Sequence, residues 1–275
     1  MSTAPTPVVG LLADDMTGAL DSAARLTPLA GPVPLEITAR TPDGESFAVS
    51  SNTREAASAA EAAVRLAQLG PRLAECDIAF KKVDSLLRGY PFTELAAVMT
   101  AAGFERCLFV PAFPDQGRIT VGARQWMLDA DGQRLAVGPD LVDAARTAGL
   151  TAVRAGGEMS LEAAQLVIAD AETAADLARA VGAARALGGR WLYCGTAGLA
   201  GALAPGRPPS PVVPEEPILA IVGSPHEVSR RQVAAVAAAG ATVRGFGVDP
   251  AARIATIGRN RLIWFSFTPS TGRDE

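Results

Sequence analysis

The sequence predicts an α/β protein whose mostly parallel sheet is flanked by helices. Short runs of valine, isoleucine, leucine and phenylalanine alternate with alanine-rich amphipathic segments, a pattern typical of successive βαβ units. Acids, bases and hydroxyls follow the apolar runs at three places, 13–21, 81–89 and 111–118. Because open α/β sheets bind their ligands at the carboxyl ends of the strands, these segments predict a site for a small, charged, oxygen-rich molecule.

In the first part of the chain, apolar strands and amphipathic helices follow one another. We expect strands at 8–14, 47–53, 78–84 and 106–113, and helices at 17–30, 54–70 and 91–102. Thr17 stands at the expected cap of the first helix, and Gly70 with Pro71 ends the second. Residues 115–160 are rich in glycine, aspartate and arginine, which predicts long loops over one face of the sheet.

The alternation resumes near residue 165 and is interrupted once by prolines. We expect strands at 165–171, 190–194, 218–224, 241–246 and 261–267, and helices at 173–187, 196–203 and 226–239. The prolines of 206–217 indicate a linker between a first domain, 1–205, and a second, 218–275. The second domain is close to the smallest size that folds independently.

Composition excludes several classes of protein. With 25 lysines and arginines against 29 aspartates and glutamates, the net charge of −4 offers no basic field for nucleic acid or an anionic membrane. We find neither a signal peptide nor an uncharged apolar run near the ~18 residues of a membrane span. The three cysteines are widely spaced and fit a reducing, cytoplasmic setting, and a single histidine excludes a histidine-rich metal site.

Two adjacent aspartates, Asp14 and Asp15, stand where the first strand ends. A carboxylate there can hold magnesium, accept a hydroxyl proton or orient a hydroxylated ligand. The alternative is a helix cap, which aspartate favours through its charge and its hydrogen bond to the first turn. We expect one of the two to cap the helix and the other to bind a ligand.

Charged residues crowd one strand-to-helix turn at Lys81, Lys82, Asp84, Ser85 and Arg88. Side chains alternate along a strand, so the second lysine and the aspartate share a face while the first lysine points away. A lysine and an arginine near helix amides form an anion site, suited to a carboxylate or a phosphate. The alternative is a surface ion-pair cluster of little energetic weight.

Weaker candidates lie at three other turns. Arg54 follows the second strand and can pair bidentately with a carboxylate, although such a residue is more often exposed in a helix's first turn. The polar side chains of the loop 111–118 can bind a ligand, but the loop is equally well explained as a rigid turn. Ser224, in the turn 221–227, is suited either to phosphate or to a simple helix cap. The glycines of 195–201 do not have dinucleotide-fingerprint spacing, so they indicate a tight strand-to-helix turn.

Together these motifs resemble the four-carbon acid sugar kinases. ADDMTGALD is similar to that family's ADD-T-G-A-x-D signature, KKVDSLLRG to its K-x-DS-LRG segment and PAFPDQGR to its PAFP-QGR segment. VIADAET, CGTAGLAGAL and IVGSPHEVSRRQ follow in the family's order, so the likeness runs from about residue 8 to 240. The resemblance implies a kinase that uses ATP and Mg²⁺ to phosphorylate a hydroxyl of a threonate-, erythronate- or tetronate-type acid.

The resemblance also implies roles for individual residues. Those carried over as binding the small-molecule sugar acid are Asp14, Asp15, Arg54, Lys82, Asp84, Ser85 and Arg88. Of these, Asp14 and Asp84 are the candidate catalytic bases, and Ser224 is implied to contact the nucleotide. The acid's carboxylate would sit against Lys82 and Arg54, while Mg²⁺ and backbone amides would offset phosphate charge. We identify no protein metal ligand.

The second domain departs from the family pattern. Family members continue past the turn 221–227 into a glycine-rich segment that helps to hold ATP, and we find none before Glu275. We therefore expect most of the nucleotide-binding domain to be missing, and its exposed apolar surface to favour a homo-oligomer. The alternative to a kinase is a non-catalytic relative that binds sugar acid without phosphoryl transfer. A nicotinamide-dependent dehydrogenase is disfavoured because its fingerprint is absent.

Overall fold

The computed structural model describes residues 5–37, 40–155, 164–206, 219–222, 227–240, 242–245 and 263–266. The chain divides into two compact units, Met1–Pro209 and Ser210–Glu275. The linker expected at 206–217 lies, apart from Gly206, outside the described residues. The assignment of an acid-binding and a nucleotide-binding domain stays a prediction.

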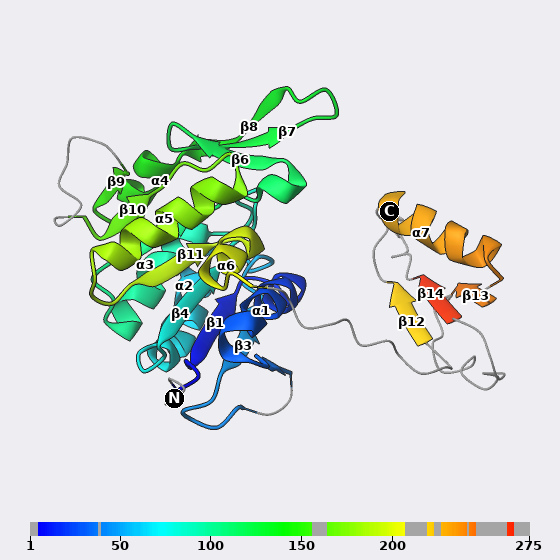
Figure 1. Cartoon of the computed structure of the whole chain (residues 1–275), viewed down its shortest axis with the longest axis horizontal. Coiled ribbons are helices and arrows are strands. Elements are labelled where there is room, and N and C mark those ends of the chain that lie inside the picture. The colour runs from blue at the N-terminus through cyan, green and yellow to red at the C-terminus, as the bar shows by residue number, and fades with distance from the viewer. Residues whose placement is uncertain are drawn as a thin grey trace, which may run out of the picture. The chain divides into compact units, whose positions relative to one another are not determined.

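A parallel sheet of eight strands forms the centre of the first unit (Figure 1). Its order is β2-β3-β1-β4-β11-β5-β10-β9, and all neighbouring strands are parallel. The strands are β1 Val9–Ala13, β2 Leu35–Glu36, β3 Phe47–Ser50, β4 Ile78–Lys82, β5 Cys107–Val110, β9 Ala152–Arg154, β10 Leu166–Ile168 and β11 Leu192–Gly195. The α/β fold with a mostly parallel sheet is confirmed.

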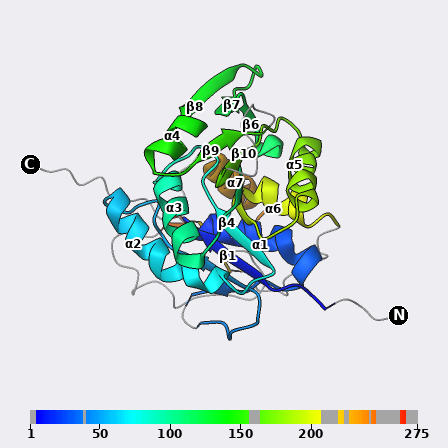
Figure 2. The same cartoon turned by 90° about the vertical axis from the view of Figure 1, so that its left-hand side faces the viewer.

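Helices cover both faces of this sheet (Figure 2). They are α1 Met16–Ala30, α2 Ala59–Leu69, α3 Pro91–Ala102, α4 Leu141–Thr147, α5 Ala174–Ala186 and α6 Ala197–Leu203, with a 3₁₀ turn η1 Gly70–Leu73 after α2. Residues of α1, α5 and α6 share one core with Leu11 of β1, whereas α2, α3 and α4 share the other with Leu12. Because side chains alternate between the two faces of the sheet, its strands contribute apolar side chains to one core on each face.

One predicted helix cap and one predicted helix start are wrong. Helix α1 is capped by Asp15 rather than Thr17, because the Asp15 carboxylate accepts the backbone N–H of Gly18. The expectation that one of the two adjacent aspartates caps this helix is confirmed. Helix α2 begins at Ala59 rather than at 54, because Ser58 caps it and accepts the N–H of Glu61. The second correction leaves the residues just after β3 in a loop.

Residues 118–140 form a separate antiparallel sheet instead of the predicted loops. Its strands are β6 Arg118–Val121, β7 Arg124–Leu128 and β8 Arg134–Asp140, in that order. Strand β8 is largely exposed, so its sequence lacks the apolar alternation by which a half-buried strand is recognised. Backbone hydrogen bonds between Thr120 and Ala171 join this sheet to the segment that follows β10.

In the second unit the structure describes three strands and a helix. They are β12 Leu219–Val222, α7 Glu227–Ala238, β13 Thr242–Gly245 and β14 Ile263–Ser266. The strands form a parallel sheet of order β12-β14-β13, as expected of an α/β unit. Across the described ranges of both units, we find no helix long and apolar enough to cross a membrane.

Candidate functional site

The candidate site lies where three neighbouring strands, β3, β1 and β4, reach their carboxyl ends. Asp14 and Asp15 follow β1, Lys82 is the last residue of β4, and Asp84 comes shortly after it. Arg54 lies in the loop between β3 and α2, where its backbone N–H donates to the carbonyl of Asp14. Because the strands are parallel and adjacent, their polar ends meet at one edge of the sheet.

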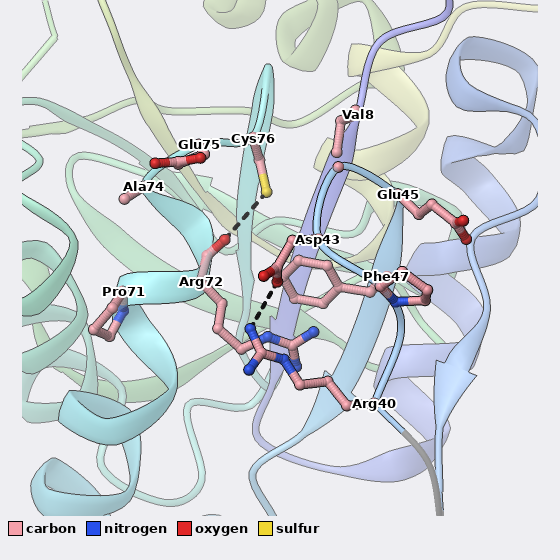
Figure 3. A pocket seen from close by; sticks show the side chains of 12 residues that line it. Val8, Arg40, Asp43, Glu45, Phe47, Pro71, Arg72, Ala74, Glu75 and Cys76 are labelled. Atoms are coloured by element: carbon pink, nitrogen blue, oxygen red, sulfur yellow. Dashed lines mark hydrogen bonds and ion pairs between the residues drawn. The ribbon is translucent and has the colours of Figure 1, made fainter.

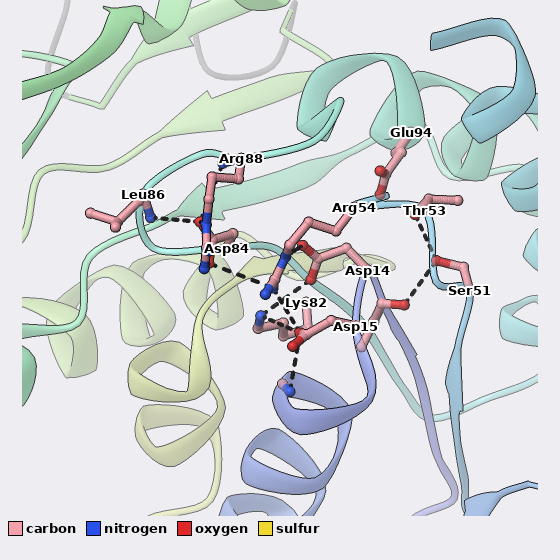
Figure 4. Close-up of polar contacts among 12 residues, drawn as sticks. Asp14, Asp15, Ser51, Thr53, Arg54, Lys82, Asp84, Leu86, Arg88 and Glu94 are labelled. Atoms are coloured by element: carbon pink, nitrogen blue, oxygen red, sulfur yellow. Dashed lines mark hydrogen bonds and ion pairs between the residues drawn. The ribbon is translucent and has the colours of Figure 1, made fainter. Parts of the chain in front are cut away.

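These side chains form one ion-pair network (Figure 4). Arg54 Nε donates to Asp14 Oδ2 at 2.8 Å, and Arg54 Nη2 donates to Asp15 Oδ1 at 2.7 Å. Lys82 Nζ donates to Asp14 Oδ1 at 3.2 Å and to Asp15 Oδ1 at 3.0 Å. Arg54 Nη2 also lies 3.5 Å from Asp84 Oδ1. The structure therefore brings together the aspartates and cations that the sequence predicted.

Asp84 organises the turn that follows β4. Its carboxylate accepts Arg88 Nε at 2.8 Å and Arg88 Nη2 at 2.9 Å, together with the backbone N–H groups of Leu86 and Arg88. Leu87 adopts a positive φ of 57° in this turn. Ser85 lies in the same turn, and its carbonyl accepts a hydrogen bond from Gln125. We call residues 84–89 the acidic turn.

Burial gives the network its electrostatic character. Asp14, Lys82 and Asp84 are only 2%, 7% and 6% exposed. Burial by itself raises the pKa of Asp14, but the charges of Lys81 and Lys82 and the Arg54 hydrogen bond outweigh it and lower that pKa below its usual value. The Asp14 carboxylate is therefore ionised at neutral pH, and both of its oxygens can accept hydrogen bonds.

A glycine allows the lysine to reach the aspartates. A Cβ at Gly18, in the first turn of α1, would lie 2.3 Å from both Cε and Nζ of Lys82. Any larger residue would displace the ammonium from Asp14 and Asp15. This role could not be predicted from the sequence, although the glycine belongs to the motif ADDMTGALD, because close approach between segments far apart in the chain leaves no local signal.

Lys81 and Glu94 form a second, fully buried ion pair beside the network. Lys81 Nζ lies 2.7 Å from Glu94 Oε2 and donates to the carbonyl of Lys82 at 3.0 Å. The side chain of Lys81 thus points away from the Lys82 ammonium, as strand alternation predicted. Glu94 was not among the predicted residues, because an acid in the first turn of a helix, here α3, is commonly explained by its interaction with the helix dipole.

The loop 111–118 contributes no side chain to the ion-pair network among the contacts described. The Asp115 carboxylate lies 3.7 Å from Arg25 Nη1, and the Arg118 guanidinium donates to the carbonyl of Gln116. This favours the rigid-turn interpretation. Ser224 lies outside the described residues, so its nucleotide role stays a prediction.

A pocket of about 370 Å³ opens at the opposite edge of the sheet, near the amino ends of β1, β3 and β4 (Figure 3). Both of its arginines are paired: Arg72 binds both oxygens of Glu36, and Arg40 binds Asp43. Burial raises the pKa of the Cys76 thiol to about 11, so it is not a reactive thiolate near neutral pH. We therefore place the functional site at the carboxyl edge.

Removal of Arg88 should alter how stability depends on pH. Burial raises the pKa of Asp84, but the hydrogen bonds of Arg88 and the charge of Arg54 outweigh it and lower the pKa to about 2. The resulting stabilisation is complete above the unfolded-state pKa, at about pH 4, and is lost as the pH falls toward the folded value. We expect Arg88→Met to be less stable than wild type above about pH 4, with the difference vanishing at lower pH.

Denaturant unfolding between pH 6 and 2 measures this difference. Arg134→Met is the matched control, because it removes an exposed ion pair with Glu172 and leaves Asp84 untouched. A stability difference for Arg88→Met that stays constant over the whole range would contradict the assigned ion pair.

Comparison with known proteins finds one matching family model and two related kinases. A family model described as a sugar-binding N-terminal domain matches residues 9–139. A D-threonate kinase of Cupriavidus necator is 35% identical over 185 residues, which cover 56% of this chain and 44% of that protein. A D-threonate kinase of Bordetella bronchiseptica is 29% identical over 259 residues, which cover 86% of this chain and 64% of that protein.

These matches support the four-carbon acid sugar kinase family for this chain.

Solved structures show the same fold. A Bordetella bronchiseptica domain of unknown function, crystallised with citrate as a domain-swapped dimer, matches with a TM-score of 0.60 and 27% identity, over 88% of this chain and 67% of that one. A Salmonella typhimurium protein described as a putative tRNA synthase has a TM-score of 0.68 at 18% identity, over 94% and 74% of the two chains, which shows the shared fold alone. The matches span only 44% and 64% of the length of the two curated kinases.

Proposed function

We propose that this chain binds a four-carbon sugar acid in the network of Asp14, Asp15, Arg54, Lys82 and Asp84, and serves the ATP-dependent phosphorylation of one of its hydroxyls. The observation that carries the proposal is the buried convergence of carboxylates and cations at the carboxyl ends of β3, β1 and β4. A sugar acid offers one carboxylate and several hydroxyls, which match buried cations and buried acceptors respectively.

The charge balance of the site explains how such a ligand would enter. The three aspartates and the three cations, Arg54, Lys82 and Arg88, offset one another. An incoming carboxylate would take donors from Arg54 and Lys82, and the aspartate oxygens so released would accept the ligand's hydroxyls. Binding would thus replace hydrogen bonds within the network by hydrogen bonds to the ligand and leave no buried donor or acceptor unsatisfied, while the ligand adds one negative charge to the site.

The relatives support a small hydroxylated acid as ligand. Two are D-threonate kinases, and the Bordetella structure contains citrate, which is itself a hydroxy acid. That protein is a domain-swapped dimer, which supports the proposal that this chain also forms a homo-oligomer.

Phosphoryl transfer depends mainly on positioning of the attacking hydroxyl and the phosphate. Its transition state is loose, so a weak base is sufficient to accept the hydroxyl proton. Asp14 or Asp84 would orient that hydroxyl and take its proton, and the low pKa of each keeps it ionised for the task. Which of the two acts stays a prediction. Asp14 is the central candidate, since both Arg54 and Lys82 bind it.

ATP and Mg²⁺ enter this proposal through the kinase relatives. Among the residues that the structure describes, no group of three or more histidine, cysteine, aspartate or glutamate side chains is arranged to hold a metal ion. The aspartates of the network are instead bound by arginine and lysine. Because Mg²⁺ is usually held by one or two carboxylates together with substrate phosphates, we assign it no protein ligand and no step of the reaction.

Separate calorimetric titrations of D-threonate, D-erythronate and Mg·ATP test the proposal, followed by an assay of ADP release. We expect binding of at least one acid, its loss in Asp14→Asn, and wild-type affinity in Asp115→Asn, where the same change is made outside the network. Failure of the wild-type protein to bind either acid would overturn the proposal. Acid binding without ATP binding would reject phosphoryl transfer and leave the alternative of a non-catalytic sugar-acid binder.

A further inference from the structure

A glutamine of the antiparallel sheet is buried between segments from three parts of the chain. Gln125 Nε2, in β7, donates to the carbonyls of Ser85 and Pro111, both at 3.0 Å. Its Oε1 lies 2.7 Å from Thr120 Oγ1, and both side chains are fully buried. Two carbonyls require the amide nitrogen and the hydroxyl can donate to the oxygen, so the chemistry of the partners sets the amide's orientation.

The sheet is irregular at this glutamine. Arg124 pairs with Asp140, but Gln125 pairs with Val137, so the register of β7 and β8 shifts between the two residues. Bulges of this kind redirect side chains and occur often beside functional sites. Here the shift accompanies a side chain that reaches out of the sheet to Ser85 and Pro111.

The same irregular stretch brings the backbone of β8 close to the acidic turn. Gly138 of β8 has a φ of +67°, and a Cβ on it would lie 3.3 Å from Cδ1 of Leu87. Leu87 itself has a left-handed backbone, a conformation that residues other than glycine rarely adopt unless their surroundings impose it. The antiparallel sheet thus meets the acidic turn twice, through Gln125 and through Gly138.

We propose that Gln125 is a positioning residue of the sugar-acid site, which holds the acidic turn so that Asp84 faces Arg54. The Ser85 carbonyl that it binds lies between Asp84 and the amides of Leu86 and Arg88, which donate back to the Asp84 carboxylate. Release of this carbonyl would loosen that arrangement. The role in binding rests on the proposed function, whereas the hold on the turn does not.

A purely structural role for Gln125, docking the antiparallel sheet onto the domain, would have a different signature. The sheet is also joined to the segment after β10 by the Thr120–Ala171 backbone pair. If docking were the only role, removal of the Gln125 amide would loosen β6 to β8 and leave the amides of the acidic turn protected.

The test compares Gln125→Met with Gln133→Met in the full chain. Methionine has similar length and removes the donors without burying a charge, and Gln133 is exposed in the turn between β7 and β8. In ligand-free protein we expect the amides of Leu86, Leu87 and Arg88 to exchange about tenfold faster in Gln125→Met, since a buried carbonyl loses its partner. Those of β1, and all amides of the Gln133 variant, should keep wild-type rates.

Two variants of Thr120 provide a second test, in which effects of different size are expected. Thr120→Val keeps the shape and removes the hydroxyl that orients the Gln125 amide, so we expect a smaller increase of exchange in the acidic turn. Thr120→Ser keeps the hydroxyl and should restore wild-type protection. D-threonate affinity should fall in the same order, by about tenfold for Gln125→Met.

Each outcome decides one claim. Unchanged exchange at Leu86, Leu87 and Arg88 in Gln125→Met, or an equal loss of protection in β1, would overturn the positioning role. If wild-type protein binds no four-carbon acid, the proposed function fails, while the exchange measurement still decides whether Gln125 holds the turn.

Discussion

Lys82→Met should weaken the binding of D-threonate by about 100-fold or more, because removal of one partner from a buried, hydrogen-bonded charge pair costs several kcal/mol. In the ligand-free protein Lys82 binds both Asp14 and Asp15. Without the ammonium, two adjacent carboxylates would face the incoming carboxylate with only Arg54 to offset them. Calorimetric titration of the purified variant measures the loss.

Arg65→Met is the matched control for Lys82→Met. It also replaces a cation by methionine, but at a half-exposed ion pair with Glu61, where such pairs contribute little. We expect its acid affinity to equal that of the wild type. A Lys82→Met protein that folds and binds D-threonate within threefold of wild type would show that this lysine does not contact the ligand.

Single replacement of either partner of the Lys81–Glu94 pair should lower the free energy of unfolding by about 3–5 kcal/mol, the cost of leaving a buried charge unpaired. Lys81 is fully buried and Glu94 is 1% exposed. Burial lowers the pKa of Lys81, but the charges of Glu94 and Asp14 outweigh it, so the net shift is upward. A raised pKa means that the stabilisation is complete below the unfolded value and is lost only as alkaline pH passes the folded value.

The double variant Lys81→Met/Glu94→Gln tests whether the two charges interact directly with each other. Both charges are gone, so we expect it to be clearly more stable than the sum of the single losses predicts, by about 2 kcal/mol or more. Denaturant unfolding at pH 7 of Lys81→Met, Glu94→Gln and the double variant gives the coupling energy. Additive losses would contradict a direct ion pair in the folded protein.

Several features of the site followed from local sequence. Alternation along β4 placed Lys82 and Asp84 on one face and turned Lys81 away, and the apolar runs located the strands that carry them. Each of these inferences depends on a period of two residues or on a strand end, and both can be recognised from neighbouring residues in the sequence.

Other features could not be predicted because their causes lie far apart in the chain. Glu94 looks like any acid in the first turn of a helix until α3 packs beside β4. The strand β8 has an exposed, irregular sequence, and a single glutamine such as Gln125 forms no pattern. Its importance arises only when β7 brings it against the carbonyls of Ser85 and Pro111.

The sequence alone determined the α/β class, the strand ends at which polar groups gather and the motifs of the four-carbon acid sugar kinases, because periodicity and motif spacing are local. Only the tertiary structure decided that Arg54 and Lys82 share Asp14 and Asp15, that Gly18 makes room for the ammonium, and that the antiparallel sheet meets the acidic turn. These contacts join residues up to 68 positions apart, as between Lys82 and Asp14. They depend on strand order and side-chain packing, which arise only when the whole sheet assembles.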